Sequence, residues 1–212
     1  MVESAKVIAS FLQQAGGKCL VVRPIGSYWK EAPSLIETKI TTVGDCWSKV
    51  GKATREMGID TVLHPDFLCA IHDSGDIDKI LQASDPTYVG LAIDTAELAI
   101  AGVDPGEVYE RHADRVRHFH FKDACFTDTL AEYKTVNAEV QLLNGGGKRE
   151  IERWFFEMGT HSGLVNFPGL MKSIKQHNYD GWIVVESDQS PHVEESCMLN
   201  GWYVRQVLSK VV

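Results

Sequence analysis

Residues 88–123 read YVGLAIDTAELAIAGVDPGEVYERHADRVRHFHFKD and contain the unit that indicates the fold. The runs YVGLAI at 88–93 and VRHFHF at 116–121 have the composition of buried strands. Between them, Asp104 and Pro105 are typical of an N-cap and the first residue of a helix that ends near Ala113. A strand, a helix and a second strand within roughly 30 residues form a βαβ unit with parallel strands. This stretch therefore predicts an α/β protein with a parallel sheet.

The same alternation of helix and strand extends to both sides of this unit. Towards the N-terminus, helical periodicity starts at Ala5 and stops at Gly16, before a strand at 19–22, and a helix at 47–57 precedes a strand at 61–63. A short helix is expected at 76–81. Towards the C-terminus we expect a helix at 168–177, a strand at 182–186 and a closing helix at 193–211. Residues 1–212 are therefore predicted to form a single domain.

Polar residues at the strand ends favour a closed (β/α) barrel over an open doubly wound sheet. The predicted strands finish in residues that bind metals or move protons, namely His64, Asp94, His120 and Glu186. Active-site groups of barrels stand at the C-terminal ends of several strands. An open nucleotide-binding sheet should show a glycine fingerprint after its first strand, and none is present. The triplet Gly145–Gly147 is interpreted as a loop.

Composition and charge limit the classes of partner. The 212 residues are 44% hydrophobic and 24% charged, which is ordinary for a globular protein with a sizeable core. A formal net charge of -8 disfavours nucleic acid and anionic membrane as partners. Five cysteines, odd in number and without a CxxC pair, indicate reduced thiols, and no signal peptide or membrane span is evident. We expect a cytoplasmic protein.

The strand ends also predict a type of chemistry. Residues two apart share a face of a strand, so Glu186 and Asp188 are expected to point in a similar direction. Mixed imidazole and carboxylate ligands suit Mn²⁺, Co²⁺, Fe²⁺ or Zn²⁺, and carboxylate-rich sets also accept Mg²⁺. Such an ion polarises a substrate carbonyl while a neighbouring carboxylate takes the adjacent proton.

Four segments in one order carry a resemblance to a known family: VGLAIDTAELAIAGVDP, HADRVRHFHFKD, FFEMGTHSGLVNFPGL and YDGWIVVESDQS. From about residue 18 onwards the chain resembles the xylose-isomerase-like sugar phosphate isomerase and epimerase superfamily, and looks most like its inosose dehydratase branch. The resemblance implies a TIM barrel whose metal is bound by Asp94, His120 and Glu186. It also implies that Lys122 and Asp123 lie beside the site to bind substrate. The implied catalytic residues are Glu186, His120 and Asp188.

The chain departs from the family pattern at three places. Glu97 stands where relatives that read DTGH have a histidine, which changes an expected substrate contact. The family's remaining ligand, a glutamate after HPH, is absent after His64, and His72 or Asp73 is the predicted replacement. His64 itself is expected to bind substrate. The first two or three βα units of the eight in a complete barrel are expected to be lacking.

Three hypotheses of function follow. The first is a divalent-metal-dependent sugar isomerase or epimerase that abstracts a proton next to a metal-polarised carbonyl. The second is an inosose-dehydratase-like lyase on a cyclitol or keto-sugar, and the third, of another class, is a truncated barrel that is non-catalytic or depends on a partner. A phosphodiesterase of the apurinic endonuclease kind is disfavoured by the acidic charge. Because exposed parallel edges are seldom left bare, a homo-oligomer is expected.

Overall fold

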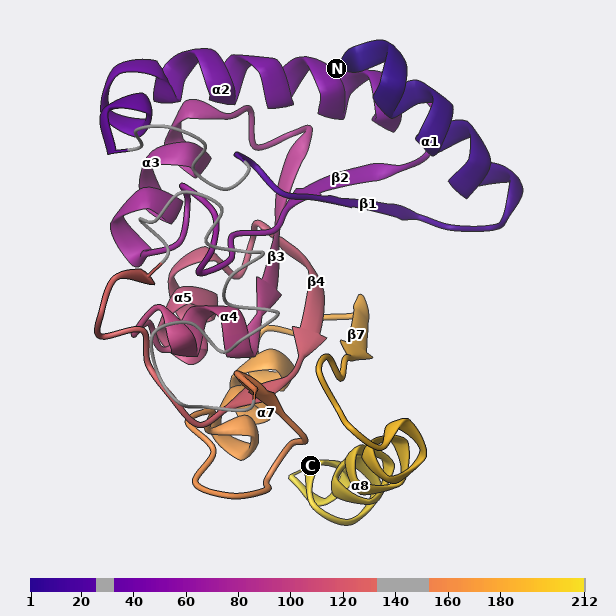
Figure 1. Cartoon of the computed structure of the whole chain (residues 1–212). Coiled ribbons are helices and arrows are strands. Elements are labelled where there is room, and N and C mark those ends of the chain that lie inside the picture. The colour runs from indigo at the N-terminus through magenta and orange to yellow at the C-terminus, as the bar shows by residue number, and fades with distance from the viewer. Residues whose placement is uncertain (26–32, 133–152, 212) are drawn as a thin grey trace.

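A parallel five-stranded sheet forms the centre of the molecule (Figure 1). The computed structural model describes residues 1–25, 33–132 and 153–211, so the predicted Gly145–Gly147 loop lies outside the described residues. The order of the strands is β1-β2-β3-β4-β7. Their bounds are Cys19–Val22 for β1, Asp60–Leu63 for β2, Val89–Asp94 for β3, Val116–Phe121 for β4 and Trp182–Val185 for β7. Each predicted strand is therefore confirmed.

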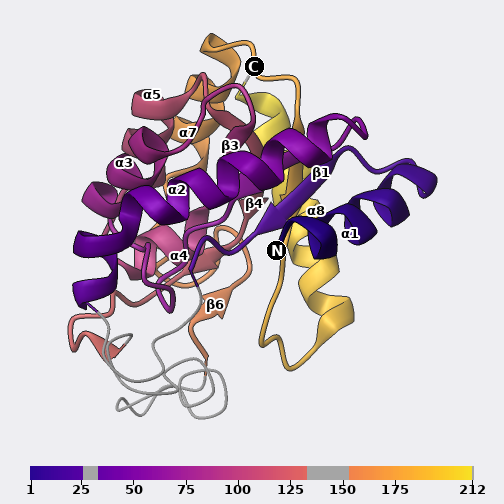
Figure 2. The same ribbon diagram turned by 90° about the horizontal axis from the view of Figure 1, so that it is seen from above.

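Helices follow or precede each strand and lie on the outer side of the curled sheet (Figures 1 and 2). They are α1 (Val2–Gln14), α2 (Pro33–Arg55), α3 (Ser74–Ala83), α4 (Thr95–Ile100), α5 (Pro105–His112), α7 (Phe167–Gln176) and α8 (Val193–Gln206). A 3₁₀ turn, η2 (Leu208–Lys210), ends the chain, so the expected closing helix stops short of residue 211. Helix α2 begins well before the predicted residue 47, and α4 was not predicted. No helix in the described ranges is long and apolar enough to cross a membrane.

The register of the sheet brings the ends of the strands to one edge. Asp94 on β3 pairs with His120 on β4, and His120 pairs with Val184 on β7. The amide of His64 donates to the Val22 carbonyl, and the amide of Glu186 donates to the Phe121 carbonyl, so both residues directly follow their strands. Because all five strands are parallel, their C-terminal ends meet on the same side.

The apolar core surrounds the middle of the sheet and leaves its ends uncovered. All six residues of β3 are buried, and Phe119 and Phe121 of β4 are completely enclosed. The edge strand β7 is mostly exposed, although it is as apolar as β3. Strands β1 and β7 are not paired with each other, so the described sheet is a half-barrel. The barrel-type fold is confirmed, with five of the eight strands of a closed barrel in the sheet.

Candidate active site

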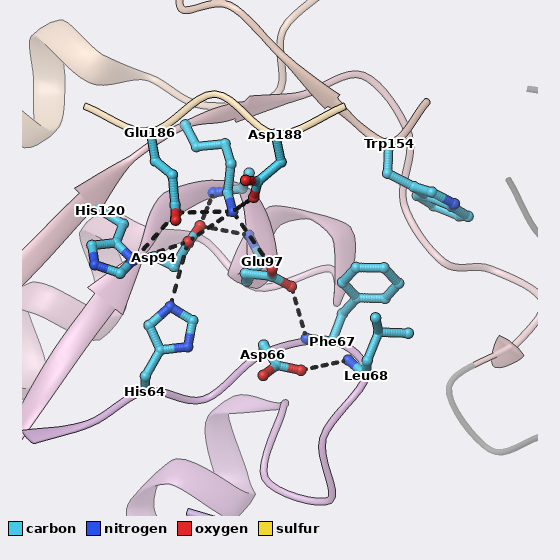
Figure 3. Close-up of polar contacts among 12 residues, drawn as sticks. His64, Asp66, Phe67, Leu68, Asp94, Glu97, His120, Trp154, Glu186 and Asp188 are labelled. Carbon is cyan, nitrogen blue, oxygen red and sulfur yellow. Dashed lines mark hydrogen bonds and ion pairs between the residues drawn. The ribbon is translucent and has the colours of Figure 1, made fainter. Parts of the chain in front are cut away.

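A pocket of about 480 Å³ lies at the C-terminal edge of the sheet. Its polar lining comes from the ends of all five strands of the sheet and the turns that follow them, and Figure 3 shows the residues that follow β2, β3, β4 and β7. The charged and imidazole groups are Arg23, His64, Asp94, Glu97, His120, Lys122, Glu186 and Asp188. This is the end of a barrel at which active sites form.

Asp94 is the central carboxylate of the pocket. It ends β3 and is also the N-cap of α4, where its Oδ1 accepts hydrogen bonds from the amides of Ala96 and Glu97, each at 3.1 Å. Those bonds fix the side chain and direct Oδ2 towards the pocket. Oδ2 lies 3.4 Å from His64 Nε2 and 3.6 Å from His120 Nδ1, and the side chain is fully buried. The cap of a short helix therefore aims one carboxylate oxygen at two imidazoles.

Glu186 completes this group from the neighbouring strand. Its Oε2 is 3.3 Å from His120 Nδ1, so His120 lies between two carboxylates. The ring centroids of His64 and His120 lie 5.0 Å apart, with the ring planes tilted by 49°. Two histidines and two carboxylates from four strands thus converge on one volume (Figure 3).

Lys122 is a buried cation that contacts the same carboxylates. Its Nζ is 2.7 Å from Asp188 Oδ2, 3.0 Å from Glu186 Oε2 and 3.2 Å from Asp94 Oδ2. Glu97 Oε1 lies at 3.7 Å, and the ring of Phe155 packs with its centroid 4.1 Å from Nζ. A lysine that is 2% exposed needs such partners, because an isolated buried charge is strongly destabilising.

Glu97 links the pocket to the turn after β2. Its Oε2 accepts the amide of Phe67 at 3.3 Å, while its Oε1 faces Lys122. In the same turn, Asp66 accepts the amide of Leu68 and pairs with Arg23 at 2.6 Å. Glu97 therefore makes two defined contacts, one with Lys122 and one with the 66–68 turn.

The electrostatic field of the cluster shifts the pKa values of its members. Burial opposes the ionisation of Asp94, but Lys122 and the two histidines outweigh burial and hold its pKa well below the usual range. Close contact with His120 lowers the pKa of Glu186. Burial also opposes protonation of His120, yet Asp94 and Glu186 raise its pKa to about 9. At neutral pH both carboxylates are therefore ionised and His120 carries a proton.

For Glu97, burial outweighs the charge of Lys122 and raises the pKa well above the usual range. Two carboxylates in one pocket thus differ in their protonation because their surroundings differ.

The donor atoms fit a divalent cation. One atom from each of His64, Asp94 and His120 lies within 4.8 Å of the others, the spacing that a shared ion requires. Asp94 Oδ2, His120 Nδ1 and Glu186 Oε2 are buried, and their contacts with one another and with Lys122 do not have hydrogen-bond geometry. Buried polar atoms normally have partners, so three such atoms directed to one point indicate a ligand. Two imidazoles and two carboxylates match Mn²⁺, Co²⁺, Fe²⁺ or Zn²⁺.

Most of the residues singled out in the sequence lie in this pocket. The structure brings together His64, Asp94, Glu97, His120, Lys122, Glu186 and Asp188. It does not bring His72 or Asp73 to them: His72 Nδ1 is 3.6 Å from Asp76 Oδ2, and Asp73 caps α3 in a separate group. His64, which we had expected to contact substrate, lies instead beside Asp94 and His120, within reach of a shared ion.

Asp123 has a different environment from the one expected. It is 1% exposed and does not line the pocket. Its carboxylate accepts the amides of Ala124 and Val165, so it fixes the turn that contains Gly163 and Val165.

The pocket residues that the sequence analysis missed include Arg23 and Phe155. Arg23 directly follows β1, so the expectation that polar residues at strand ends line the site would have identified it if applied to the first strand. Phe155 comes from the short β6 (Phe155–Phe156), which pairs antiparallel with β5 (Asp123–Ala124). No sequence signal links Phe155 to Lys122, because they are 33 positions apart and meet through this antiparallel pair of strands.

Residues 2–199 match the family model described as xylose isomerase-like TIM barrel. The chain belongs to this family. Among curated members of the xylose isomerase-like group, the inosose dehydratase of Lacticaseibacillus casei is 27% identical over 190 residues, covering 85% of this chain. The aligned part is 61% of that relative, so the chain spans about three fifths of its length. The inosose dehydratase of Bacillus velezensis is 28% identical over 165 residues, covering 78% of this chain and 52% of that relative.

Solved structures agree with the xylose isomerase-like fold. The probable 3-DHS dehydratase AsbF from Bacillus anthracis superposes with a TM-score of 0.75 at 10% identity, covering 97% of this chain and 70% of AsbF. The IOLI protein with a bound zinc atom superposes with a TM-score of 0.70 at 15% identity, covering 100% of this chain and 70% of that protein. At these identities the similarity establishes the fold.

Proposed function

We propose that this chain carries the active site of a divalent-metal-dependent enzyme that isomerises, epimerises or dehydrates a sugar or cyclitol. The observation that supports it most strongly is the convergence of His64 Nε2, Asp94 Oδ2, His120 Nδ1 and Glu186 Oε2. These four residues would hold the ion, and Mn, Co, Mg, Zn and Fe are the candidates. The zinc atom in the structurally similar IOLI protein supports a metal in this fold.

The bound ion would stabilise negative charge that develops on a carbonyl oxygen of the substrate. Asp188 is the proposed base that takes the neighbouring proton, because it reaches the pocket from just beyond β7 and contacts only Lys122 among the groups of the cluster. Glu186 is less available, since its Oε2 is shared by His120 and Lys122. The Lys122 ammonium orients Asp188 and adds positive charge where the enediolate forms.

Two outcomes are possible after proton removal. Return of the proton to the same or a neighbouring carbon gives an epimer or an isomer. Departure of hydroxide gives a dehydrated product, and protonated Glu97 can supply the proton that turns it into water. The curated relatives named inosose dehydratase favour the second outcome, with an inosose or a related cyclitol as substrate. Glu97 would contact a substrate hydroxyl in either case.

Metal content tests the site first. The purified chain should contain about one ion per chain by mass spectrometry, and His120→Ala and Glu186→Ala should lose it. His192→Ala is the matched control, since His192 is exposed and outside the pocket. Wild type that remains metal-free after incubation with Mn²⁺, Co²⁺ or Zn²⁺ contradicts the proposal.

The reaction is then followed by nuclear magnetic resonance in D₂O with ketoses and inososes as substrates. Exchange of the carbon-bound proton beside the carbonyl with all other CHOH signals retained indicates isomerisation or epimerisation, and loss of the CHOH signal of the next carbon indicates dehydration. Asp188→Asn should retain the metal and lose the exchange. An Asp188→Asn variant with wild-type exchange excludes Asp188 as the base.

A further inference from the structure

Asp188, the proposed base, lies in the loop between β7 and α8 rather than in the sheet. Strand β7 ends at Val185, and the side chain of Asp188 is 46% exposed. Its Oδ2 is nevertheless 2.7 Å from Lys122 Nζ, and Figure 3 shows the carboxylate directed at this ammonium. Because the hydrogen-bonded ladder of the sheet does not fix a residue beyond the strand, other contacts must hold the base over the pocket.

The residues on both sides of Asp188 are tethered to buried parts of the molecule. Before it, Ser187 Oγ shares a hydrogen bond with Ser196 Oγ of α8, and Ser196 is 1% exposed. After it, Gln189 Oε1 accepts the backbone amide of Trp154 at 2.8 Å, although the two residues are 35 positions apart. Trp154 is completely buried. The loop is therefore attached at two points, one before the base and one after it.

Gln189 has a backbone conformation that its residue type rarely adopts. Its φ is +57°, in the left-handed region that favours glycine. In a residue with a side chain such a conformation persists only where the surroundings impose it, and it is concentrated at functional sites. Gln189 also lines the pocket next to the base, and its hydrogen bond to the Trp154 amide is a contact that can impose the turn.

Trp154 and Phe155 link Gln189 to the cation that contacts the base. The Trp154 amide holds Gln189, and the ring of the neighbouring Phe155 has its centroid 4.1 Å from Lys122 Nζ. The Trp154 ring packs in turn against Phe67, with ring centroids 5.4 Å apart. Two adjacent residues thus fix both the chain that follows the base and the ammonium that its carboxylate contacts.

We propose that Gln189 is a positioning residue for Asp188. Its hydrogen bond to Trp154 sets the left-handed turn after the base, and this turn keeps the Asp188 carboxylate beside Lys122 and within reach of the carbon that loses its proton. This role rests on the proposed function, in which Asp188 takes that proton. Because the side-chain oxygen of Gln189 is engaged by Trp154, its loss affects the rate of proton removal more than the binding of substrate.

Two substitutions separate the hydrogen bond from the size of the side chain. Gln189→Glu keeps an oxygen that accepts the Trp154 amide, whereas Gln189→Met has a similar length and lacks that oxygen. In the D₂O exchange assay, Gln189→Met should lower kcat by about tenfold to a hundredfold, because a small displacement of a reacting group is costly. KM and metal content should be unchanged, and Gln189→Glu should behave like wild type. Gln206→Met is the control, since Gln206 is exposed on α8 and outside the pocket.

A crystal structure of Gln189→Met tests the role independently of activity. Residue 189 should leave the left-handed region, and Asp188 Oδ2 should move beyond about 4 Å from Lys122 Nζ, the limit of an ion pair. An unchanged loop, or a raised KM at wild-type kcat, overturns the positioning role. Normal kcat in Gln189→Met beside an inactive Asp188→Asn overturns this role alone, whereas wild-type exchange in Asp188→Asn overturns the proposed base and this role together.

Discussion

Replacement of Lys122 by methionine tests whether this ammonium is the counterion of the pocket. Asp94 is fully buried, and Lys122 Nζ lies 3.2 Å from its Oδ2 and 3.0 Å from Glu186 Oε2. Methionine keeps an unbranched side chain over Phe155 but removes the charge. Removal of one partner from a buried ion pair costs about 3–5 kcal/mol, because the other charge stays buried without compensation. The free energy of unfolding should fall by about this amount in metal-free protein.

Urea unfolding in EDTA measures the effect. With a slope of about 2 kcal/mol per M urea, a loss of about 3–5 kcal/mol lowers the midpoint by about 1.5–2.5 M. Mn²⁺ should restore more stability to Lys122→Met than it adds to wild type, since the ion neutralises the same carboxylates. Lys6→Met is the control, because Lys6 forms an exposed pair with Glu3 on α1 and such pairs contribute little. Equal midpoints for the Lys122 and Lys6 variants would refute the counterion role.

Three further predictions concern stability. Burial lowers the pKa of His120, but Asp94 and Glu186 outweigh burial and raise it from 6.5 to about 9. Protonated His120 therefore stabilises the metal-free fold fully below about pH 6.5, and this stabilisation is lost by about pH 9. The Tm difference between wild type and His120→Asn should narrow over this interval, and a constant difference contradicts the assignment. Gly44→Ala places a methyl group against the Ala83 carbonyl oxygen, where α2 meets α3, and should lower the free energy of unfolding in urea by about 1–3 kcal/mol. Gly75→Ala is the control, because the nearest neighbour of its added methyl group is at 3.4 Å, and it should lower the free energy of unfolding less. Equal losses of stability in the two variants would show that the contact between α2 and α3 relaxes freely. Asp104→Ala removes the N-cap of α5 and should lower the free energy of unfolding by about 1 kcal/mol, or Tm by about 2–4 °C, whereas the exposed Asp114→Ala should leave the thermal transition unchanged.

The strands and the type of fold could be predicted because their signals are local. Each apolar run is short, and most end in a polar residue at the C-terminal edge, so Asp94, His120 and Glu186 could be assigned to one site before any coordinates. Helix α4 could not be recognised in the same way. Its residues TAELAI continue the apolar run of β3 without a break, and only the hydrogen bonds of Asp94 to Ala96 and Glu97 mark its start.

The fourth donor and the role of Asp123 depend on tertiary structure. His64 reaches Asp94 because β2 and β3 pair with Leu63 opposite Leu91, a register that the sequence does not specify. The chain after Asp66 turns into α3 and carries His72 to Asp76 instead. Asp123 is next to Lys122 in sequence, yet its side chain points to backbone amides of a turn rather than to the pocket. Proximity in the chain was therefore a poor guide to proximity in the site.

The most direct test of the metal site is an anomalous difference map from crystals of the protein soaked in MnCl₂ or CoCl₂. One peak is expected between His64 Nε2, Asp94 Oδ2, His120 Nδ1 and Glu186 Oε2, with the Lys122 ammonium beside it. A peak at His72 and Asp76 instead, or no peak in the pocket at saturating metal, would contradict the assignment of these four residues as ligands.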